Sequence, residues 1–151
     1  MKTTKMICCV LIITIVCSLA GCGFFGEQRY TCDIENIKLI QIIKLGDYNE
    51  ETLLFNHTVI CEIDDHAAFA EKLLDIKQSV NWGDPGSFHT GDIAIYIEYL
   101  NGDFDRISAT AQTKVRDGKG AGGGYIFFNK KQFTALLNEY LPENEQIAVD
   151  S

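Results

Sequence analysis

The segment Ile93–Tyr99, which reads IAIYIEY, decides the fold class of this 151-residue chain. Large apolar residues occupy every second position, and this alternation predicts a strand that buries one face. Asn101-Gly102 follows almost at once, and Asn-Gly is the strongest short signal for a tight hairpin turn. Residues 104–111 are therefore expected to return as a second strand, which begins an antiparallel sheet.

Three further apolar segments predict additional strands around this hairpin. Residues 34–45 (IENIKLIQIIKL) and 57–63 (HTVICEI) precede it, and residues 125–128 (YIFF) follow it. Isoleucine, valine and aromatic residues bounded by polar or glycine-rich stretches are typical of strands. The glycine-rich stretch 114–124 is expected to be a mobile connection between the last two strands.

Two amphipathic segments predict helices. The first begins at Asp64 or Asp65 and runs to about residue 80, and the second begins at Asn129 and ends before Pro142. Asp and Asn are preferred N-cap residues, and apolar side chains recur at helical spacing in both segments. The predicted order is ββαβββα. This order indicates an α+β fold, with a five-stranded antiparallel sheet and both helices on one face.

The N-terminus has the parts of a secretory signal. Lys2 and Lys5 precede an uncharged apolar run at residues 6–19, and small residues follow it. The run is about 14 residues long, whereas a membrane-spanning helix needs about 20. A short signal-anchor helix is the alternative interpretation.

Leu19-Ala20-Gly21-Cys22 resembles the lipobox of bacterial prolipoproteins at all four positions. The resemblance implies removal of residues 1–21 and attachment of a diacylglyceryl group, with chains such as palmitate, to the sulfur of Cys22. Two or three acyl chains hold a protein at a membrane far more firmly than one. The implied location is extracytoplasmic, at the cell membrane, or at the outer membrane in a Gram-negative host.

This resemblance sets the expected domain organisation. Residues 22–33 form the lipidated N-terminus and a tether, residues 34–142 form a single α+β domain, and residues 143–151 form an acidic tail. The last helix carries the pattern F-x-x-L-L-x-x-Y-L from Phe133 to Leu141. About 60 C-terminal residues thereby resemble small uncharacterised lipoproteins of low-GC Gram-positive bacteria, and this resemblance implies no activity.

Charge excludes one class of partner. The chain has 13 basic and 21 acidic residues, and loss of the two lysines in the signal leaves a mature net charge near −10. Nucleic acid binding requires a basic surface, so no nucleic acid partner is expected. The expected partners are the membrane, through the lipid anchor, and an unidentified envelope protein or cell-wall component.

Two cysteines remain beside the lipidated one after processing, and they allow a single disulfide. The midpoint between Cys32 and Cys61 is Gly46-Asp47, a turn dipeptide. A hairpin folded there would place the two cysteines opposite each other in an oxidising compartment. Two buried free thiols are the alternative.

The basic residues among the candidate contact residues gather near the glycine-rich stretch. Residues 118–124 lack the Ser or Thr and the spacing of a phosphate-binding P-loop. The surrounding basic residues indicate an anionic partner, such as a headgroup, a cell-wall polymer or an acidic protein, unless they form a solvated face. The candidate binding surface comprises Trp82, His89, Arg116, Lys119, Lys130 and Lys131, with Lys114 beside it.

No metal or cofactor is expected, because the spacing of the histidines, cysteines and acids matches none of the common metal sites. The leading hypothesis is a membrane-anchored, extracytoplasmic binding module without catalysis. One alternative is a small hydrolase-like envelope enzyme that uses His89 and Asp92, and another is an immunity or inhibitor protein.

Overall fold

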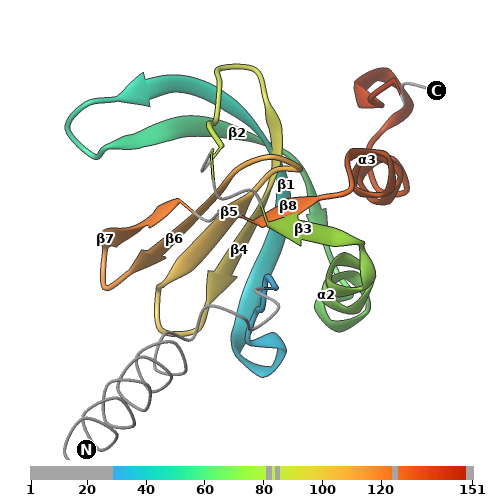
Figure 1. Cartoon of the computed structure of the whole chain (residues 1–151), viewed down its shortest axis with the longest axis horizontal. Coiled ribbons are helices and arrows are strands. Elements are labelled where there is room, and N and C mark those ends of the chain that lie inside the picture. The colour runs from blue at the N-terminus through green and yellow to red at the C-terminus, as the bar shows by residue number, and fades with distance from the viewer. Residues whose placement is uncertain (1–28, 81–82, 84–85, 124–125, 149–151) are drawn as a thin grey trace, which may run out of the picture.

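The computed structural model of the chain describes residues 29–80, 83, 86–123 and 126–148 (Figure 1). The expected signal peptide, Cys22 and Trp82 lie outside these residues. Within the described ranges, no helix is both long and apolar enough to cross a membrane.

The described elements alternate between hairpins and short helices. The helical elements are η1 (Ile34–Asn36), α2 (His66–Asp75), α3 (Lys130–Asn138) and η2 (Glu143–Glu145). The strands are β1 (Ile37–Asn49), β2 (Leu54–Ile63), β3 (Gln78–Val80), β4 (Ile93–Tyr99), β5 (Phe104–Ile107), β6 (Gln112–Arg116), β7 (Lys119–Gly123) and β8 (Ile126–Phe128).

The predicted α+β class, the antiparallel sheet and the order of the main elements are confirmed. The main sheet has the strand order β2-β1-β4-β5-β6-β7, and every neighbouring pair is antiparallel. It includes the predicted hairpin at Asn101-Gly102, where Gly102 adopts a φ of 88°. Four of the five predicted strands, β1, β2, β4 and β5, lie in this sheet. The fifth, β8, pairs with β3 in a separate two-stranded sheet.

The stretch 114–124 was predicted as a mobile connection, and this prediction is wrong over most of its length. Residues up to Arg116 belong to β6, and Lys119–Gly123 form β7. Asp117 and Gly118 join them with φ angles of 51° and 71°. Positive φ at both central residues defines the hairpin turn that Asp-Gly favours. The glycine content of the stretch obscured this signal.

The first helix is shorter than predicted. Asp65 caps it, because its Oδ1 accepts a hydrogen bond from the Ala68 amide at 3.1 Å. The helix ends at Asp75, and Ile76 is extended with ψ 134°. Residues 78–80, predicted as its last turn, form β3 and pair with β8. Asn129 caps α3 in the same way, accepting from the Gln132 amide at 3.0 Å.

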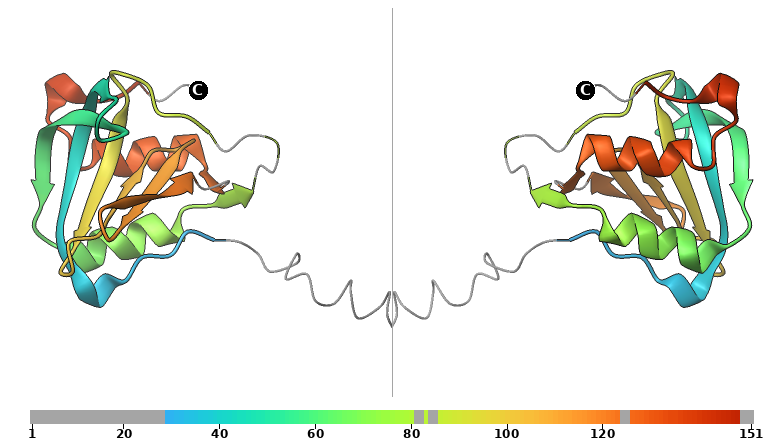
Figure 2. Two further views of the ribbon diagram at one scale, coloured as in Figure 1. Left: turned by 90° about the vertical axis from the view of Figure 1, so that its left-hand side faces the viewer. Right: turned by 90° about the vertical axis from the view of Figure 1, so that its right-hand side faces the viewer.

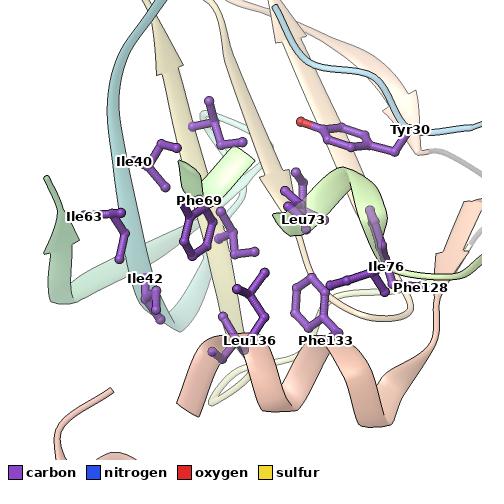
Figure 3. Packing of buried hydrophobic residues seen from close by; sticks show 14 of the residues in the cluster. Tyr30, Ile40, Ile42, Ile63, Phe69, Leu73, Ile76, Phe128, Phe133 and Leu136 are labelled. Atoms are coloured by element: carbon purple, nitrogen blue, oxygen red, sulfur yellow. The ribbon is translucent and has the colours of Figure 1, made fainter. Parts of the chain in front are cut away.

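Both helices pack on one face of the main sheet (Figure 2). Figure 3 shows Phe69 of α2 and Phe133 of α3 pointing into the same core as Ile40 and Ile42 of β1. Burial of each such side chain stabilises the fold by roughly 1.5–3 kcal/mol. The other residues of this core cluster are Tyr30, Ile63, Leu73, Ile76, Ile95, Ile97, Tyr99, Ile107, Phe128, Leu136, Leu137 and Leu141.

The expected boundaries of the domain need correction at both ends. Tyr30, expected in the tether, is buried in the core. Asn138 of α3 binds both the amide and the carbonyl of Ile147, at 2.9 and 2.8 Å. The expected acidic tail is therefore attached to α3 through Ile147.

The geometry of the β1–β2 hairpin contradicts the predicted disulfide between Cys32 and Cys61. The strands turn after Asn49, whose Oδ1 accepts from the amides of Glu51 and Thr52, and not at residues 46–47. Cys61 therefore lies opposite Ile42. Cys32 precedes η1 and lies outside the hairpin. Both thiols are free, so the predicted bridge is not formed.

Candidate functional site

A cavity of about 740 Å³ lies where the N-terminal segment meets one end of the main sheet. The N-terminal segment and η1 form one wall, and the β4–β5 turn and β6 form the other. The lining residues are Thr31, Cys32, Asp33, Asn36, Tyr99, Leu100, Asn101, Asp103, Lys114 and Arg116. We call this space the tether-end cavity.

A buried carboxylate lies beside the cavity. Asp105 of β5 is 0 % exposed. Its Oδ2 accepts hydrogen bonds from the hydroxyls of Tyr30 and Tyr99, each at 2.8 Å, and its Oδ1 accepts from Nη2 of Arg116 at 2.6 Å. A buried carboxylate is tolerated only when it is paired and hydrogen-bonded. The three donors meet this requirement and fix the N-terminal segment on the sheet.

Burial and the neighbouring Asp105 charge raise the pKa of both tyrosines above the usual range. The two hydroxyls therefore keep their protons and act as donors. Asp105 has its oxygens occupied by these donors and serves as a structural acid.

Arg116 is held on several sides. Its Nη1 donates to the carbonyls of Phe104 and Val115, each at 3.0 Å, and its guanidinium lies 5.4 Å from the Tyr99 ring centroid. Its Nε is 3.9 Å from Oδ2 of Asp103. The guanidinium thus links the buried acid to the cavity wall in one fixed orientation.

Lys114 is the second cation of the cavity. Its Nζ lies 3.3 Å from the Thr31 carbonyl oxygen and 5.0 Å from the Tyr30 ring centroid. No ion pair of Lys114 occurs in the part of the chain that the structure describes. Asp33 lies on the opposite wall and accepts from Nδ2 of Asn36 at 2.8 Å. The cavity therefore presents two cations and two carboxylates, on Lys114, Arg116, Asp33 and Asp103.

Cys32 is the only cavity residue with a nucleophilic sulfur among those that line the space. Burial, with a further contribution from Asp105, raises the pKa of its thiol to about 11. The thiolate is the reactive form of cysteine. Cys32 is therefore protonated at neutral pH and poorly suited to nucleophilic attack.

The structure separates the basic residues of the predicted binding surface into two regions. Arg116 lines the cavity, and Lys119 is exposed at the tip of the β6–β7 hairpin. Lys130 and Lys131 lie at the start of α3, on the opposite side of the molecule from this tip (Figure 1). Lys130 lines a second pocket of about 330 Å³ with Asp92.

His89 lies in neither cavity. Its side chain is 75 % exposed, and its Nδ1 is 3.6 Å from Oδ2 of Asp92. The same carboxylate oxygen accepts from the His89 backbone amide at 2.7 Å. Asp92 thus closes a turn around His89. The pair expected from the sequence is brought together, in an exposed position.

Tyr30, Tyr99 and Asp105 were not predicted as site residues. Asp105 carries a usable signal, because it is two residues before Ile107 and so shares the core face of its strand. An acid at a core position requires partners. Tyr30 lies in a stretch without periodicity, and no sequence pattern connects it with Asp105.

The charge arrangement of the cavity is the main guide to its chemistry. No group of three or more His, Cys, Asp or Glu residues is placed to hold a metal ion in the described ranges. No family model, curated protein or solved structure matches the chain. The lining charges of both signs suit a small ligand that carries both signs of charge.

Proposed function

We propose that the chain is an extracytoplasmic lipoprotein that acts as a non-catalytic binding module, with the tether-end cavity as its ligand site. The ligand is a small group that carries an ammonium and a phosphate or carboxylate. The observation that carries the proposal is the cavity beside the incoming N-terminal segment, which is lined by the two cations Lys114 and Arg116 and the two carboxylates Asp33 and Asp103.

The position of the cavity supports a role near the membrane. Tyr30, which is buried in the core, lies eight positions after Cys22. A fully extended chain of this length spans at most ~28 Å. A lipid anchor on Cys22 would hold the cavity within this distance of the membrane surface, since Thr31 and Cys32 line it.

The protonation and bonding of the side chains support binding rather than catalysis. A general base needs a free acceptor at the reacting proton, and a nucleophile needs a lowered pKa or an adjacent base. Asp105 is engaged by three donors, and the pKa of the Cys32 thiol is raised. Neither group supplies a general base or a nucleophile, so the charged side chains that line the cavity are left to bind a ligand.

Calorimetric titration of the full-length chain in detergent micelles with O-phosphoethanolamine tests the ligand class. The zwitterion should bind at least tenfold more tightly than inorganic phosphate or ethanolamine, because each of these occupies half of the charges. Lys114→Gln should weaken binding at least tenfold. Lys119→Gln removes an exposed lysine outside the cavity and should change nothing.

Equal affinity for phosphate and for the zwitterion would refute the assignment of both charges. The lipid anchor is tested separately by labelling cells with radioactive palmitate. The wild-type chain should carry label and sediment with membranes, whereas Cys22→Ala should do neither. Label that persists in the Cys22→Ala variant would refute the anchor.

A further inference from the structure

The sheet face opposite the helices carries two groups of aromatic side chains in contact. His57 stacks on Tyr96 at 5.3 Å between centroids, and Tyr96 lies 5.1 Å from Phe104. Tyr48 meets Phe55 edge to face at 5.2 Å. Phe55 and His57 are two residues apart in β2, so they share one face at about 7 Å spacing. The outer strip comprises Tyr48, Phe55, His57, Tyr96, Phe104 and Arg106.

Arg106 is the unusual member of this strip. It is 4 % exposed and lies directly opposite Tyr96 in the sheet. Its Nη2 is 3.3 Å from Nδ1 of His57, and its guanidinium lies 6.0 Å from the Phe104 centroid. Nε is buried without a hydrogen-bond partner, and no carboxylate within the described residues pairs with the guanidinium.

A buried cation without a counter-ion destabilises a fold unless a binding partner supplies one. His57 is a weak substitute, since a neutral imidazole accepts only one hydrogen bond and carries no negative charge. A carboxylate would pair with the guanidinium through two charge-assisted hydrogen bonds. The Arg106 guanidinium can therefore still donate hydrogen bonds to a carboxylate from a partner.

The tip of the β1–β2 hairpin shows a second, independent irregularity. Leu53 has a φ of 56° and is 70 % exposed. A non-glycine residue in the left-handed region costs about 1–2 kcal/mol, and turn positions of this kind favour Gly or Asn. Tyr48 and Val59 of the same hairpin are also exposed large apolar residues. A strained backbone under an exposed leucine is expected where the side chain makes contact with a partner.

The hairpin tip is accessible from the side away from the membrane tether. Only residues 37–44 of β1 pair with β4, so the rest of the hairpin projects beyond the body of the sheet (Figure 1). β1 has 13 residues and spans about 40 Å at ~3.3 Å per residue. The tether-end cavity adjoins its first residue, and the tip lies at its far end.

We infer that the outer strip and Leu53 form the docking surface for a protein partner that inserts an acidic side chain against Arg106 and covers Leu53 and Tyr48 with apolar surface. Charge complementarity selects the acid, because Arg106 is a buried cation that no carboxylate of the described residues pairs with. The exposed apolar residues at the tip of the β1–β2 hairpin indicate that the partner is a macromolecule, because a small acid bound at Arg106 would leave Leu53 exposed to solvent. This surface is independent of the tether-end cavity and of its ligand.

The charge requirement is tested first with benzoate and benzamide, which share a shape and differ in charge. Benzoate should shift the NMR signals of the His57 ring and the Arg106 side chain saturably in the full-length chain in micelles. Benzamide should leave them unchanged, and Arg106→Gln should abolish the benzoate shifts at His57. Equal shifts with both probes, or none with benzoate, would overturn the role of Arg106.

The partner is tested by photocrosslinking in cells from position 59, which lies on the outer face of β2, with position 71 on α2 as control. A discrete adduct should form from position 59 alone and map to a segment with Asp or Glu. Arg106→Gln should reduce it at least tenfold. An adduct to a second copy of this chain, an adduct that lacks an acid, or no adduct would overturn the proposal.

The Leu53→Gly variant distinguishes loss of the contact with the partner from loss of folding stability. Glycine relieves the positive φ, so the variant should melt at an equal or higher temperature than the wild type. The crosslinked adduct should nevertheless fall at least tenfold, because the apolar side chain is gone. An unchanged adduct in this well-folded variant would remove Leu53 from the docking surface.

Discussion

Replacement of Asp105 by asparagine tests whether the buried carboxylate holds the N-terminal segment on the sheet. Asp105→Asn keeps the shape and removes the charge that accepts from Tyr30, Tyr99 and Arg116. Breaking a buried pair typically costs ~3–5 kcal/mol. The side chain of Arg116 is 36 % exposed, so water compensates part of its loss. We therefore expect Asp105→Asn to lower the free energy of unfolding by ~3 kcal/mol.

This loss is large against the ~5–15 kcal/mol that stabilise a typical domain. For a domain of this size, each kcal/mol shifts the melting temperature by about 3–5 °C, so a decrease of roughly 9–15 °C follows. Urea unfolding followed by circular dichroism and tyrosine fluorescence measures the free energy. Both signals should move together, since one network joins the tyrosines to the sheet.

Asp103→Asn is the matched control. Asp103 lies 3.9 Å from Nε of the same arginine, and its side chain is partly accessible. A partly exposed pair contributes less than ~1 kcal/mol. If Asp105→Asn destabilises the chain no more than Asp103→Asn, the buried carboxylate of Asp105 does not hold the N-terminal segment on the sheet. Tyr30→Phe removes only one hydrogen bond to Asp105 and should lower the free energy of unfolding by ~1.5–3 kcal/mol, as expected for a lost hydrogen bond to a charged acceptor.

Three further predictions concern pH, backbone strain and thiol reactivity. Burial and the adjacent Arg106 lower the pKa of His57 in the fold, so the unfolded chain takes up the proton first. Stability should be fully present above pH ~6.5 and should fall below it, and His57→Gln should flatten this part of a urea-midpoint profile. Leu53→Gly should raise the free energy of unfolding by about 0.5–1 kcal/mol in urea titrations, and a loss would contradict the strain at φ 56°. Alkylation of Cys32 by iodoacetamide should rise with a midpoint near pH 11 in the folded chain and near the ordinary cysteine value in urea, as followed by peptide mass spectrometry.

The elements with strong periodicity could be predicted from the sequence. The alternation in β4 and the Asn101-Gly102 turn led directly to the β4–β5 hairpin. The second sheet could not be found in this way, because β3 and β8 have three residues each and such short segments show no period. Residues 76–80 continue the apolar spacing of α2, but residues 78–80 pair with β8 and the Asn129 amide binds the Lys77 carbonyl, so tertiary contacts make this segment extended.

The candidate site was less predictable than the fold. Charge clustering along the chain pointed to Lys114, Arg116 and Lys119 together with Lys130 and Lys131. The β6–β7 hairpin and α3 then carry these residues to different sides of the molecule. The contact between Tyr30 and Asp105 joins residues 75 positions apart. Contacts of this range depend on the topology of the sheet, which periodicity does not specify.

Asp105 and Arg106 are neighbours in β5, and together they distinguish the two faces of the sheet. Successive side chains of a strand point to opposite faces, so this acid and this base cannot pair with each other although both are buried. Each face must therefore supply its own counter-charge. The inner face does so with Arg116 and two tyrosines, whereas the described outer face offers Arg106 a neutral histidine and the ring of Phe104 but no carboxylate. The inner acid thus completes the fold from within the chain, and the outer base is the group whose missing partner we assign to another protein.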